Sequence, residues 1–329
     1  MNASLRHLLL LLSWLALSAP AAAGAPSDAR GWLERMATAM NQLSYQGTFV
    51  YLRDGRVETM RITHVVDDDG TRERLVSVDG PHRELIRDEN GVRCVIGDDD
   101  AEMMQDPLIT RAYFPDLPLA DIAASNGAYV FETGGTARIA GHTARRVSIQ
   151  PGDAYRYGYD FWLEVHSGLL LKWVLYDTRK NALAKLMFTD LRLGSEVDPR
   201  ELRSDTPPER FTPLRAALPP GKLRSGAGPR WEPARLPPGF RLETHTQRLG
   251  DGGEVFGHLV YSDGLAAVSV YIESVGAADE AIEEGVSRLG TAHAYSRNMG
   301  AMRVTVIGEV PAETVRSIGS TVTLLAGGD

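Results

Sequence analysis

Closely spaced strand patterns, separated by short turns, constrain the fold of this chain more than any other feature. In residues 45–51, Tyr45, Phe49 and Tyr51 alternate with more polar neighbours, which is the period of a strand with one buried face. The turn Arg53-Asp54-Gly55-Arg56 leads into the next strand pattern. The predicted strands after the first are residues 57–66, 72–77, 83–88, 92–96, 129–133, 142–149, 155–165, 169–178 and 182–193. Parallel strands would need long crossovers, so we expect roughly ten antiparallel strands.

Helical segments flank and interrupt this meander. Trp32, Met36 and Met40 recur at helical spacing after a cap at Ser27 or Asp28. An apolar insertion, residues 98–126, is predicted to contain a second, short helix. We therefore expect a strongly curved sheet or incomplete barrel with helices on its concave side. Such a sheet can enclose a ligand cavity, unless the helices fill it and leave an ordinary core.

A linker divides the mature chain into two domains. Residues 206–230 are rich in proline and glycine and show no strand or helix period. We assign 1–25 to a signal peptide, 26–205 to the first domain, 206–230 to the linker and 231–329 to the second domain. The linker is basic, and its candidate anion contacts are Arg215, Lys222, Arg224 and Arg230. The alternative is a passive tether whose charge serves only to keep it solvated.

The second domain is predicted to be an antiparallel sheet with one covering helix. Strand patterns cover residues 240–249, 255–262, 266–273, 291–297 and 302–308. A terminal helix follows Pro311, with its apolar stripe at Val315, Ile318, Val322 and Leu325. Residues 279–284 are predicted to form a short acidic helix or lid. One helix covers one face only, so the other face is available for a partner.

The first 25 residues have the pattern of an export signal. Arg6 and His7 precede a short apolar run, and small residues around Ala23 fit an A-x-A cleavage site. The single cysteine, Cys94, rules out an internal disulfide, so stability must come from a core. We expect a soluble periplasmic protein. The formal net charge of −8 makes nucleic acid an improbable partner.

Catalytic and metal-binding patterns are absent from the sequence. It contains no G-x-S-x-G, H-E-x-x-H, C-x-x-C or G-x-G-x-x-G motif. His64, His142 and His166 are scattered and are interpreted as structural, and Cys94 as a buried thiol. The acidic runs 67–69 and 98–100 lack the spacing of a calcium loop. We expect no enzyme activity, no cofactor and no metal.

Three stretches resemble one known family. They are YQGTFVYLRDGRVETMRITHVVDDDGTRERLVSVDGPHRELIR (residues 45–87), LPPGFRL (236–242) and HLVYSDGLAAVSVYIE (258–273). Together they resemble the RseB/MucB family, periplasmic regulators of the sigma-E-type envelope-stress pathway and of alginate production. The resemblance extends over essentially the whole mature chain. These stretches combine strand residues with turns in a fixed order, so they are fold signatures rather than catalytic ones.

The resemblance implies a fold and a mechanism. The first domain is expected to be similar to LolA and LolB, a half-open antiparallel barrel whose apolar cavity is plugged by helices. The second domain is expected to bind the periplasmic region of a transmembrane anti-sigma factor of the RseA/MucA type and to shield it from regulated proteolysis. Lipid or lipopolysaccharide acyl chains released by envelope damage are expected to relieve that protection. The protein would then be a negative regulator.

The two expected partners define two sets of candidate residues. Candidates for lipid contact are Phe49, Tyr51, Phe114 and Trp173, with ordinary core packing as the alternative. Candidates for partner contact are Phe240, Phe256, Tyr261 and Tyr271. Tyr271 shares strand parity with Ser269 and Glu273, which predicts an exposed face, whereas the other three suit the core.

Other functions remain open at this stage. A periplasmic lipoprotein or lipid carrier of the LolA type would share the cavity and the signal peptide, but would need only one domain. A lipid-modifying enzyme would need a nucleophile and base, which the sequence does not supply. The oligomeric state is also open, and a homodimer is one alternative.

Overall fold

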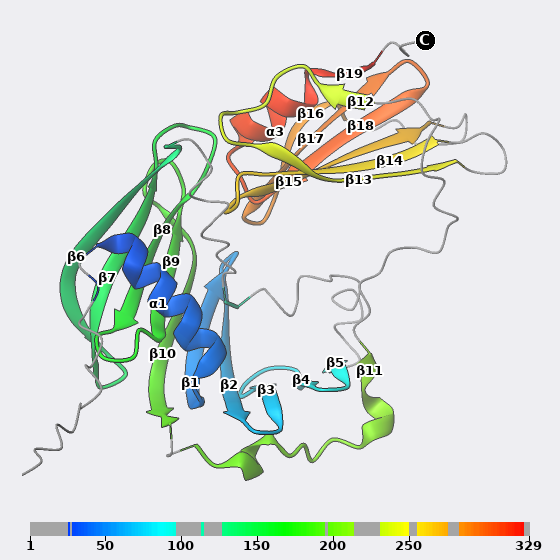
Figure 1. Ribbon diagram of the computed structural model, residues 1–329. Helices are drawn as coiled ribbons and strands as arrows, with labels where there is room; N and C mark the ends of the chain where they lie inside the picture. Colours follow the sequence, from blue (N-terminus) through cyan, green and yellow to red (C-terminus); the bar gives the residue numbers. More distant parts are fainter. Residues whose placement is uncertain are drawn as a thin grey trace, which may run out of the picture.

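Two antiparallel sheets make up most of the protein (Figure 1). The computed structural model describes residues 26, 28–96, 113–114, 127–194, 197–213, 231–249, 255–275 and 283–325. The expected signal peptide, most of the insertion 98–126 and most of the acidic segment 279–284 lie outside these residues. In the part of the chain that is described, no helix is long and apolar enough to span a membrane.

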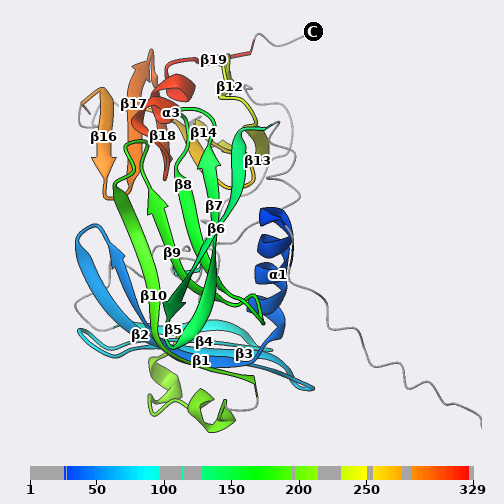
Figure 2. The same cartoon turned by 90° about the vertical axis from the view of Figure 1, so that its left-hand side faces the viewer.

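The first sheet is a half-open antiparallel sheet, as the strand pattern predicted. Within the described ranges it has eleven strands in the order β11-β5-β4-β3-β2-β1-β10-β9-β8-β7-β6. The strands are β1 (Tyr45–Arg53), β2 (Arg56–Asp67), β3 (Gly70–Ser77), β4 (Arg83–Asp88), β5 (Gly91–Ile96), β6 (Tyr129–Ile139), β7 (His142–Pro151), β8 (Gly158–Glu164), β9 (Leu170–Tyr176), β10 (Ala182–Leu193) and β11 (Thr212–Pro213). β6 and β11 end the order without pairing with each other, so the barrel stays open. The sheet bends strongly between β1–β5 and β6–β10 (Figure 2).

Helix α1 (Ala29–Gln42) covers part of this sheet. Its N-terminus is capped by Asp28, whose side chain accepts a hydrogen bond from the Gly31 amide over 2.8 Å. Trp32, Leu33 and Met36 are buried and belong to one core with the aromatic side chains of the strands. The predicted amphipathic helix is therefore present, and its apolar stripe faces the sheet.

Several strand boundaries differ from the sequence prediction, and two of the differences bear on how the domains meet. β8 begins at Gly158 instead of residue 155, because residues 155–157 leave the first sheet and contact Pro238 and helix α3 (Ala312–Gly319) of the second domain. β11 lies within the segment expected to be linker, where Thr212 pairs with Cys94 of β5. Residues 206–213 thus lie against the first sheet.

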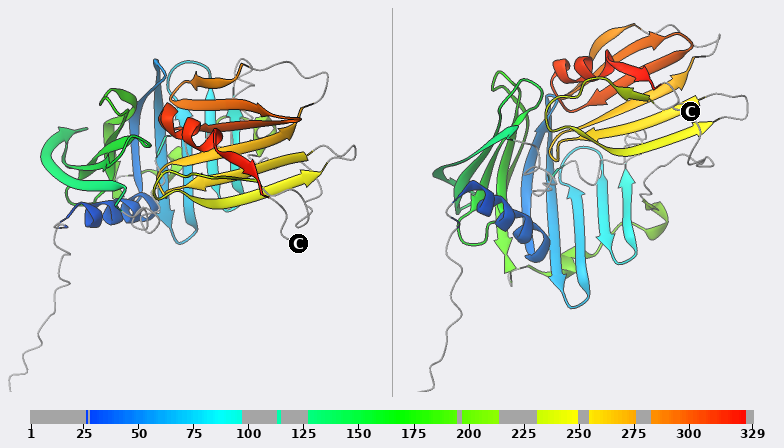
Figure 3. Two further views of the ribbon diagram at one scale, coloured as in Figure 1. Left: turned by 90° about the horizontal axis from the view of Figure 1, so that it is seen from above. Right: turned by 45° about the horizontal axis from the view of Figure 1, so that its top comes forward.

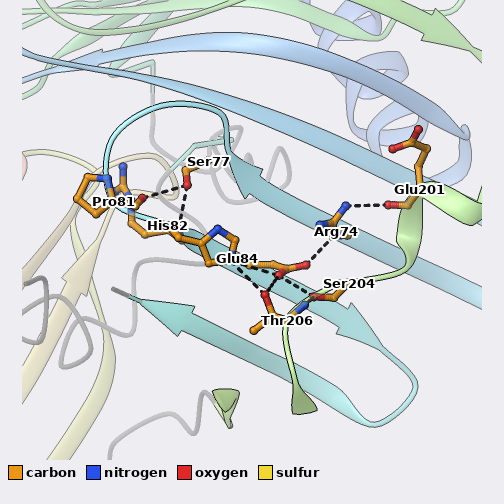
Figure 4. Close-up of polar contacts among 9 residues, drawn as sticks. Arg74, Ser77, Pro81, His82, Glu84, Glu201, Ser204 and Thr206 are labelled. Atoms are coloured by element: carbon orange, nitrogen blue, oxygen red, sulfur yellow. Dashed lines mark hydrogen bonds and ion pairs between the residues drawn. The ribbon is translucent and has the colours of Figure 1, made fainter. Parts of the chain in front are cut away.

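A buried carboxylate fastens the chain that precedes β11. Glu84 on β4 is 2% exposed and accepts hydrogen bonds from Arg74 Nε (2.6 Å), Ser204 Oγ (2.7 Å) and Thr206 Oγ1 (2.8 Å) (Figure 4). The two hydroxyls belong to the segment after η3 (Pro199–Leu202). Burial opposes the charge of Glu84, but these hydrogen bonds outweigh it and lower the pKa of the carboxyl.

The second sheet has six strands in the described residues, in the order β13-β14-β15-β18-β17-β16. They are β13 (Arg241–Leu249), β14 (Val255–Ser262), β15 (Ala267–Ser274), β16 (Gly285–Leu289), β17 (Ala292–Met299) and β18 (Met302–Gly308). Helix α3 (Ala312–Gly319) ends earlier than predicted. Val322 is instead in β19 (Val322–Leu324), which pairs with β12 (Trp231–Pro233), and Leu325 lies beyond it. The sequence prediction missed β12, β16 and β19, which are short.

One face of this sheet forms a small core. Val268, Val270 and Ile272 of β15 are each 0% exposed and belong to one cluster with Val315 and Ile318 of α3. α3, β12 and β19 lie together on this side of the sheet (Figure 3). The residues between these three valine and isoleucine positions point to the opposite face, which is the face that a single helix leaves uncovered.

Candidate functional site

The four candidate lipid residues lie in one aromatic cluster of the first sheet. Phe49 and Tyr51 come from β1, Trp173 from β9, and Phe114 from the insertion. The ring of Phe49 is 5.5 Å from that of Phe114, and the ring of Tyr51 is 6.0 Å from that of Trp173. Alternation along β1 and β9 places these side chains on the same face, so strand parity carried this part of the prediction.

Tyr113 joins the cluster and is held by polar contacts. Its backbone oxygen accepts a hydrogen bond from Trp173 Nε1 over 2.8 Å, and its hydroxyl donates to Glu58 Oε2 over 2.9 Å. Glu58 in turn lies 3.1 Å from Arg83. Burial, and secondarily the Glu58 charge, raise the pKa of the Tyr113 hydroxyl. The phenol is therefore neutral and acts as a donor.

The cluster is closed by its own packing. Phe49 is 0% exposed, and Tyr51 and Trp173 are each 5% exposed. The rings of Tyr113 and Tyr51 are 5.0 Å apart. An acyl chain could contact the strand residues only if Tyr113 and Phe114 moved away from them.

A separate hollow of about 560 Å³ lies on the other face of this sheet. Its lining is polar and comprises Glu132, Arg146, Gln150, Asp160, Tyr176 and Lys180. Arg146 Nη2 donates to both carboxylate oxygens of Asp160, over 2.9 and 2.8 Å. None of the four candidate lipid residues lines it, and paired charges of this kind do not suit an acyl chain.

The second sheet carries a half-buried aromatic group on its uncovered face. Tyr271 stacks on His258 with 4.5 Å between ring centroids and lies 6.2 Å from Phe256. His258 Nε2 is 3.1 Å from Ser269 Oγ. Burial lowers the pKa of His258, which favours the neutral ring. We call Phe256, His258 and Tyr271 the open-face group.

The remaining two partner candidates lie elsewhere. Phe240 is 6% exposed and Tyr261 is 3% exposed, and both pack into the core of the second sheet. Burial raises the pKa of Tyr261 to about 12. Neither side chain is accessible to a partner in this structure.

Two other residues singled out in the sequence, His64 and Cys94, lie in surroundings that suit a structural role. His64 Nδ1 is 3.0 Å from the backbone oxygen of Leu43, and burial raises the pKa of the Cys94 thiol. No group of three His, Cys, Asp or Glu side chains that could hold a metal occurs among the residues that the structure describes. The linker candidates Arg215, Lys222, Arg224 and Arg230 lie outside those residues.

The sequence did not predict two groups of polar residues. One is Glu58 with Arg83 and Tyr113, which comes together where Tyr113 of the insertion lies against β2 and β4. The other is Arg156 with Asp263, a fully buried pair between the two sheets. The only sequence signal for the second was a charged residue between Tyr155 and Tyr157 in a strand-like run.

Comparison with known proteins identifies the same family along both parts of the chain. Residues 28–206 match the MucB/RseB N-terminal domain and residues 226–323 the MucB/RseB C-terminal domain. The sigma factor AlgU regulatory protein MucB of Pseudomonas aeruginosa is 32% identical over 317 residues, 94% of each chain. The sigma-E factor regulatory protein RseB of Haemophilus influenzae is 29% identical over 88% of this chain and 90% of its own.

A solved structure resembles the whole fold. The crystal structure of MucB in complex with MucA(peri) matches with a TM-score of 0.70 and 30% identity, covering 91% of this chain and 100% of that chain. The match spans both sheets, so the order and the general arrangement of the two domains are shared with that protein.

Proposed function

The chain belongs to the MucB/RseB family, and we propose on that basis that it binds the periplasmic region of a transmembrane anti-sigma factor of the MucA/RseA type. Its relatives along nearly the full length are sigma-factor regulatory proteins, which favours this function over a lipoprotein carrier. The observation that carries the proposal is the likeness of both domains, in order, to MucB crystallised with MucA(peri). The bound region would be shielded from regulated proteolysis in the periplasm.

The open-face group is the proposed anchor for this partner. Phe256, His258 and Tyr271 present aromatic surface on the side of the sheet opposite α3. Tyr271 is half-buried, so part of its ring is accessible, and tyrosine is enriched at protein interfaces and among their hot spots. Phe240 and Tyr261 support the fold of the same sheet from its other side.

The aromatic cluster of the first sheet is the proposed lipid site. Its strand residues Phe49, Tyr51 and Trp173 are aromatic, lie on one face of the sheet and are covered by Tyr113 and Phe114. A lipid would release the anti-sigma factor only by binding the free or rearranged state better than the bound state. We likewise propose that acyl chains bind in this cluster. A homodimer and a linker that runs from residue 206 to residue 230 are proposed as well.

Binding measured by calorimetry between the mature protein and the purified periplasmic region of the cognate anti-sigma factor tests the function. We expect a saturable complex, and Tyr271→Ala to weaken it by about 1–2 kcal/mol, or roughly 5- to 30-fold. The control is Leu324→Ala, an exposed residue of β19 on the α3 side. Failure to bind, together with capture of many different lipoproteins from envelope extract, would establish the carrier alternative instead.

A further inference from the structure

The loop between β7 and β8 enters the second domain. Residues 155–157, which we call the docking loop, belong to neither strand. Thr314 Oγ1 of α3 donates a hydrogen bond to the backbone oxygen of Tyr155 over 2.6 Å. The hydroxyl of Tyr157 lies 3.3 Å from His293 Nδ1 of β17. The loop therefore contacts two separate elements of the C-terminal domain, and Figure 2 shows the upper ends of β7 and β8 beneath that domain.

Arg156, between these tyrosines, is completely buried. It is 0% exposed, and its Nη1 lies 2.9 Å from Asp263 Oδ2, whose side chain is also 0% exposed. Its Nη2 donates to the backbone oxygen of Pro238 over 2.5 Å. Its guanidinium carbon lies 5.2 Å from the ring centroids of both Tyr129 and Phe240. Its Nε also lies 3.2 Å from Asp153 Oδ1 of its own loop, so Arg156 contacts groups of both domains.

Asp263 is held from both sides. Its Oδ2 accepts a hydrogen bond from Tyr129 of β6 over 2.9 Å, in addition to the ion pair with Arg156. Its Oδ1 accepts from the amides of Leu265 and Ala266 over 2.9 and 2.8 Å, which fixes the β14–β15 turn. Leu265 from this turn packs against the core of the first domain. Each domain therefore inserts one loop into the other.

A second, more exposed contact lies beside the first. Arg53, at the end of β1, lies 2.7 Å from Glu309 Oε1 and 2.8 Å from Thr291 Oγ1. The side chains of Arg53 and Glu309 are 34% and 33% exposed. Nearby, a Cβ on Gly290 would lie 2.4 Å from Asp54 Oδ2, so the two domains approach closely here.

These contacts specify the relative arrangement of the two domains more than they stabilise it. Removing two charges from water opposes association, and their mutual attraction roughly compensates, so a buried pair adds more geometric specificity than stability. When the domains separate, both charges return to water and the pair is lost at small net cost. Polar interfaces between domains permit relative motion, whereas large apolar ones do not.

We propose that the docking loop is a latch that holds the two domains in one arrangement, with the Arg156–Asp263 pair as its central contact. Opening the latch separates the domains while each keeps its fold. Removing Arg156 leaves the Asp263 carboxylate buried without an opposite charge. Removing Asp263 leaves the buried guanidinium with only Asp153 Oδ1 of its own loop, 3.2 Å from Arg156 Nε. In either case, separation of the domains is the route by which the remaining charge regains water. The proposal concerns the arrangement of the domains and does not depend on the proposed function.

The test measures the distance between the domains. Spin labels at Asp69→Cys in the first domain and Arg316→Cys in the second, in a Cys94→Ser background, report this distance, because both side chains are largely exposed. We expect one narrow distribution for the parent protein. Arg156→Gln and Asp263→Asn should each add a population at longer distance. Circular dichroism establishes that each variant is folded.

Arg146→Gln is the matched control. Arg146 Nη2 lies 2.8 Å from Asp160 Oδ2, between β7 and β8, so the variant removes a more exposed ion pair that lies within one domain. We expect the parent distribution for this variant. Folded Arg156→Gln and Asp263→Asn proteins with the parent distribution would overturn the proposal, as would equal broadening by Arg146→Gln.

Glu309→Ala covers the case in which a buried variant does not fold. It removes the half-exposed acceptor of Arg53 and leaves the buried pair in place. We expect a smaller but measurable gain of the longer-distance population. A Glu309→Ala distribution identical to that of the parent, with both buried variants unfolded, would also overturn the latch, since the interface would then be inseparable from the fold.

Discussion

Trp173 Nε1 donates a hydrogen bond to the backbone oxygen of Tyr113 over 2.8 Å, although the two residues are 60 positions apart. This bond ties the described part of the insertion to β9, in the middle of the aromatic cluster. The Tyr113 hydroxyl adds a second tie to Glu58. The insertion is therefore held to the sheet by directed polar contacts as well as by ring packing.

Replacing Trp173 by phenylalanine tests that tie. The variant keeps an aromatic ring but leaves a buried backbone oxygen without its donor, so the free energy of unfolding should fall by about 1–3 kcal/mol. Urea denaturation measures it. Trp162→Phe is the control, because Trp162 is half-buried on the other face, with Lys172 Nζ 4.1 Å from its ring, and should lose at most about 1 kcal/mol. Equal losses would argue against the tie.

A charge at Phe114 tests the proposed lipid site. Burying a phenylalanine side chain contributes about 1.5–3 kcal/mol, so Phe114→Asp should weaken binding of a fluorescent fatty acid by about tenfold or more. Titration of probe fluorescence measures the affinity. Val78→Asp, at a 51% exposed turn position, should bind as the parent does. A folded Phe114→Asp protein with parental affinity would remove support for acyl-chain binding in the cluster.

Glu84 predicts a loss of stability in acid. Its carboxyl has a pKa lowered in the folded state from an ordinary value of 4.5, so its contribution is present above that value and is lost as the pH falls through the lowered pKa. Glu84→Gln should reduce the free energy of unfolding at pH 7 by about 1–3 kcal/mol and flatten its decline in acid.

Denaturation curves at pH 7 and in acid check the Glu84 prediction. Protease cleavage of the segment at Ser204, which Glu84 binds, is a second measurement. Glu201→Gln is the matched control, because Glu201 is exposed and contributes only its backbone oxygen to Arg74. A Glu84→Gln protein with the acid response of the parent would contradict the assignment.

The lowered pKa of His258 predicts a second pH dependence of stability, at a higher pH than that of Glu84. Burial lowers the pKa of the folded state below the ordinary 6.5, so the neutral ring stabilises the fold above 6.5 and that stability is lost as the pH falls. His258→Phe keeps a ring against Tyr271 and should reduce the loss of stability between neutral and mildly acidic pH. Thermal unfolding across that range measures it. His245→Phe, at an exposed position of β13, should behave as the parent, and the prediction fails if His258→Phe does too.

The linker charges give a prediction about regulation. If Arg215, Lys222, Arg224 and Arg230 contact anions, changing all four to Gln should weaken the response to anionic lipid or the binding of the anti-sigma factor. The remaining parental effect should decrease with added salt. Proteolytic protection of the anti-sigma factor, with and without lipid, is the measurement. Unchanged protection and unchanged release would leave a passive tether.

The sequence determined the local elements of this protein because their signals are local. Period-two alternation with short turns predicted β1 to β10, and helical spacing after Asp28 predicted α1. Parity along β1 and β15 placed Phe49, Tyr51 and Tyr271 on the correct faces. The family motifs in residues 45–87, 236–242 and 258–273 indicated the function, which the chain's chemistry alone did not reveal.

The tertiary structure decided which distant polar groups meet. Nothing near Arg156 in the chain indicates that Asp263 becomes its partner, because the pair forms only when two separately folded sheets come together. Short strands such as β11 and β19 form because another strand pairs with them. Two or three residues are too few to show a period, so the sequence did not predict these strands. The packing of the insertion against the first sheet likewise brings Tyr113 to Glu58. Periodicity specifies which face a side chain takes, and only the packing of the elements specifies what that face contacts.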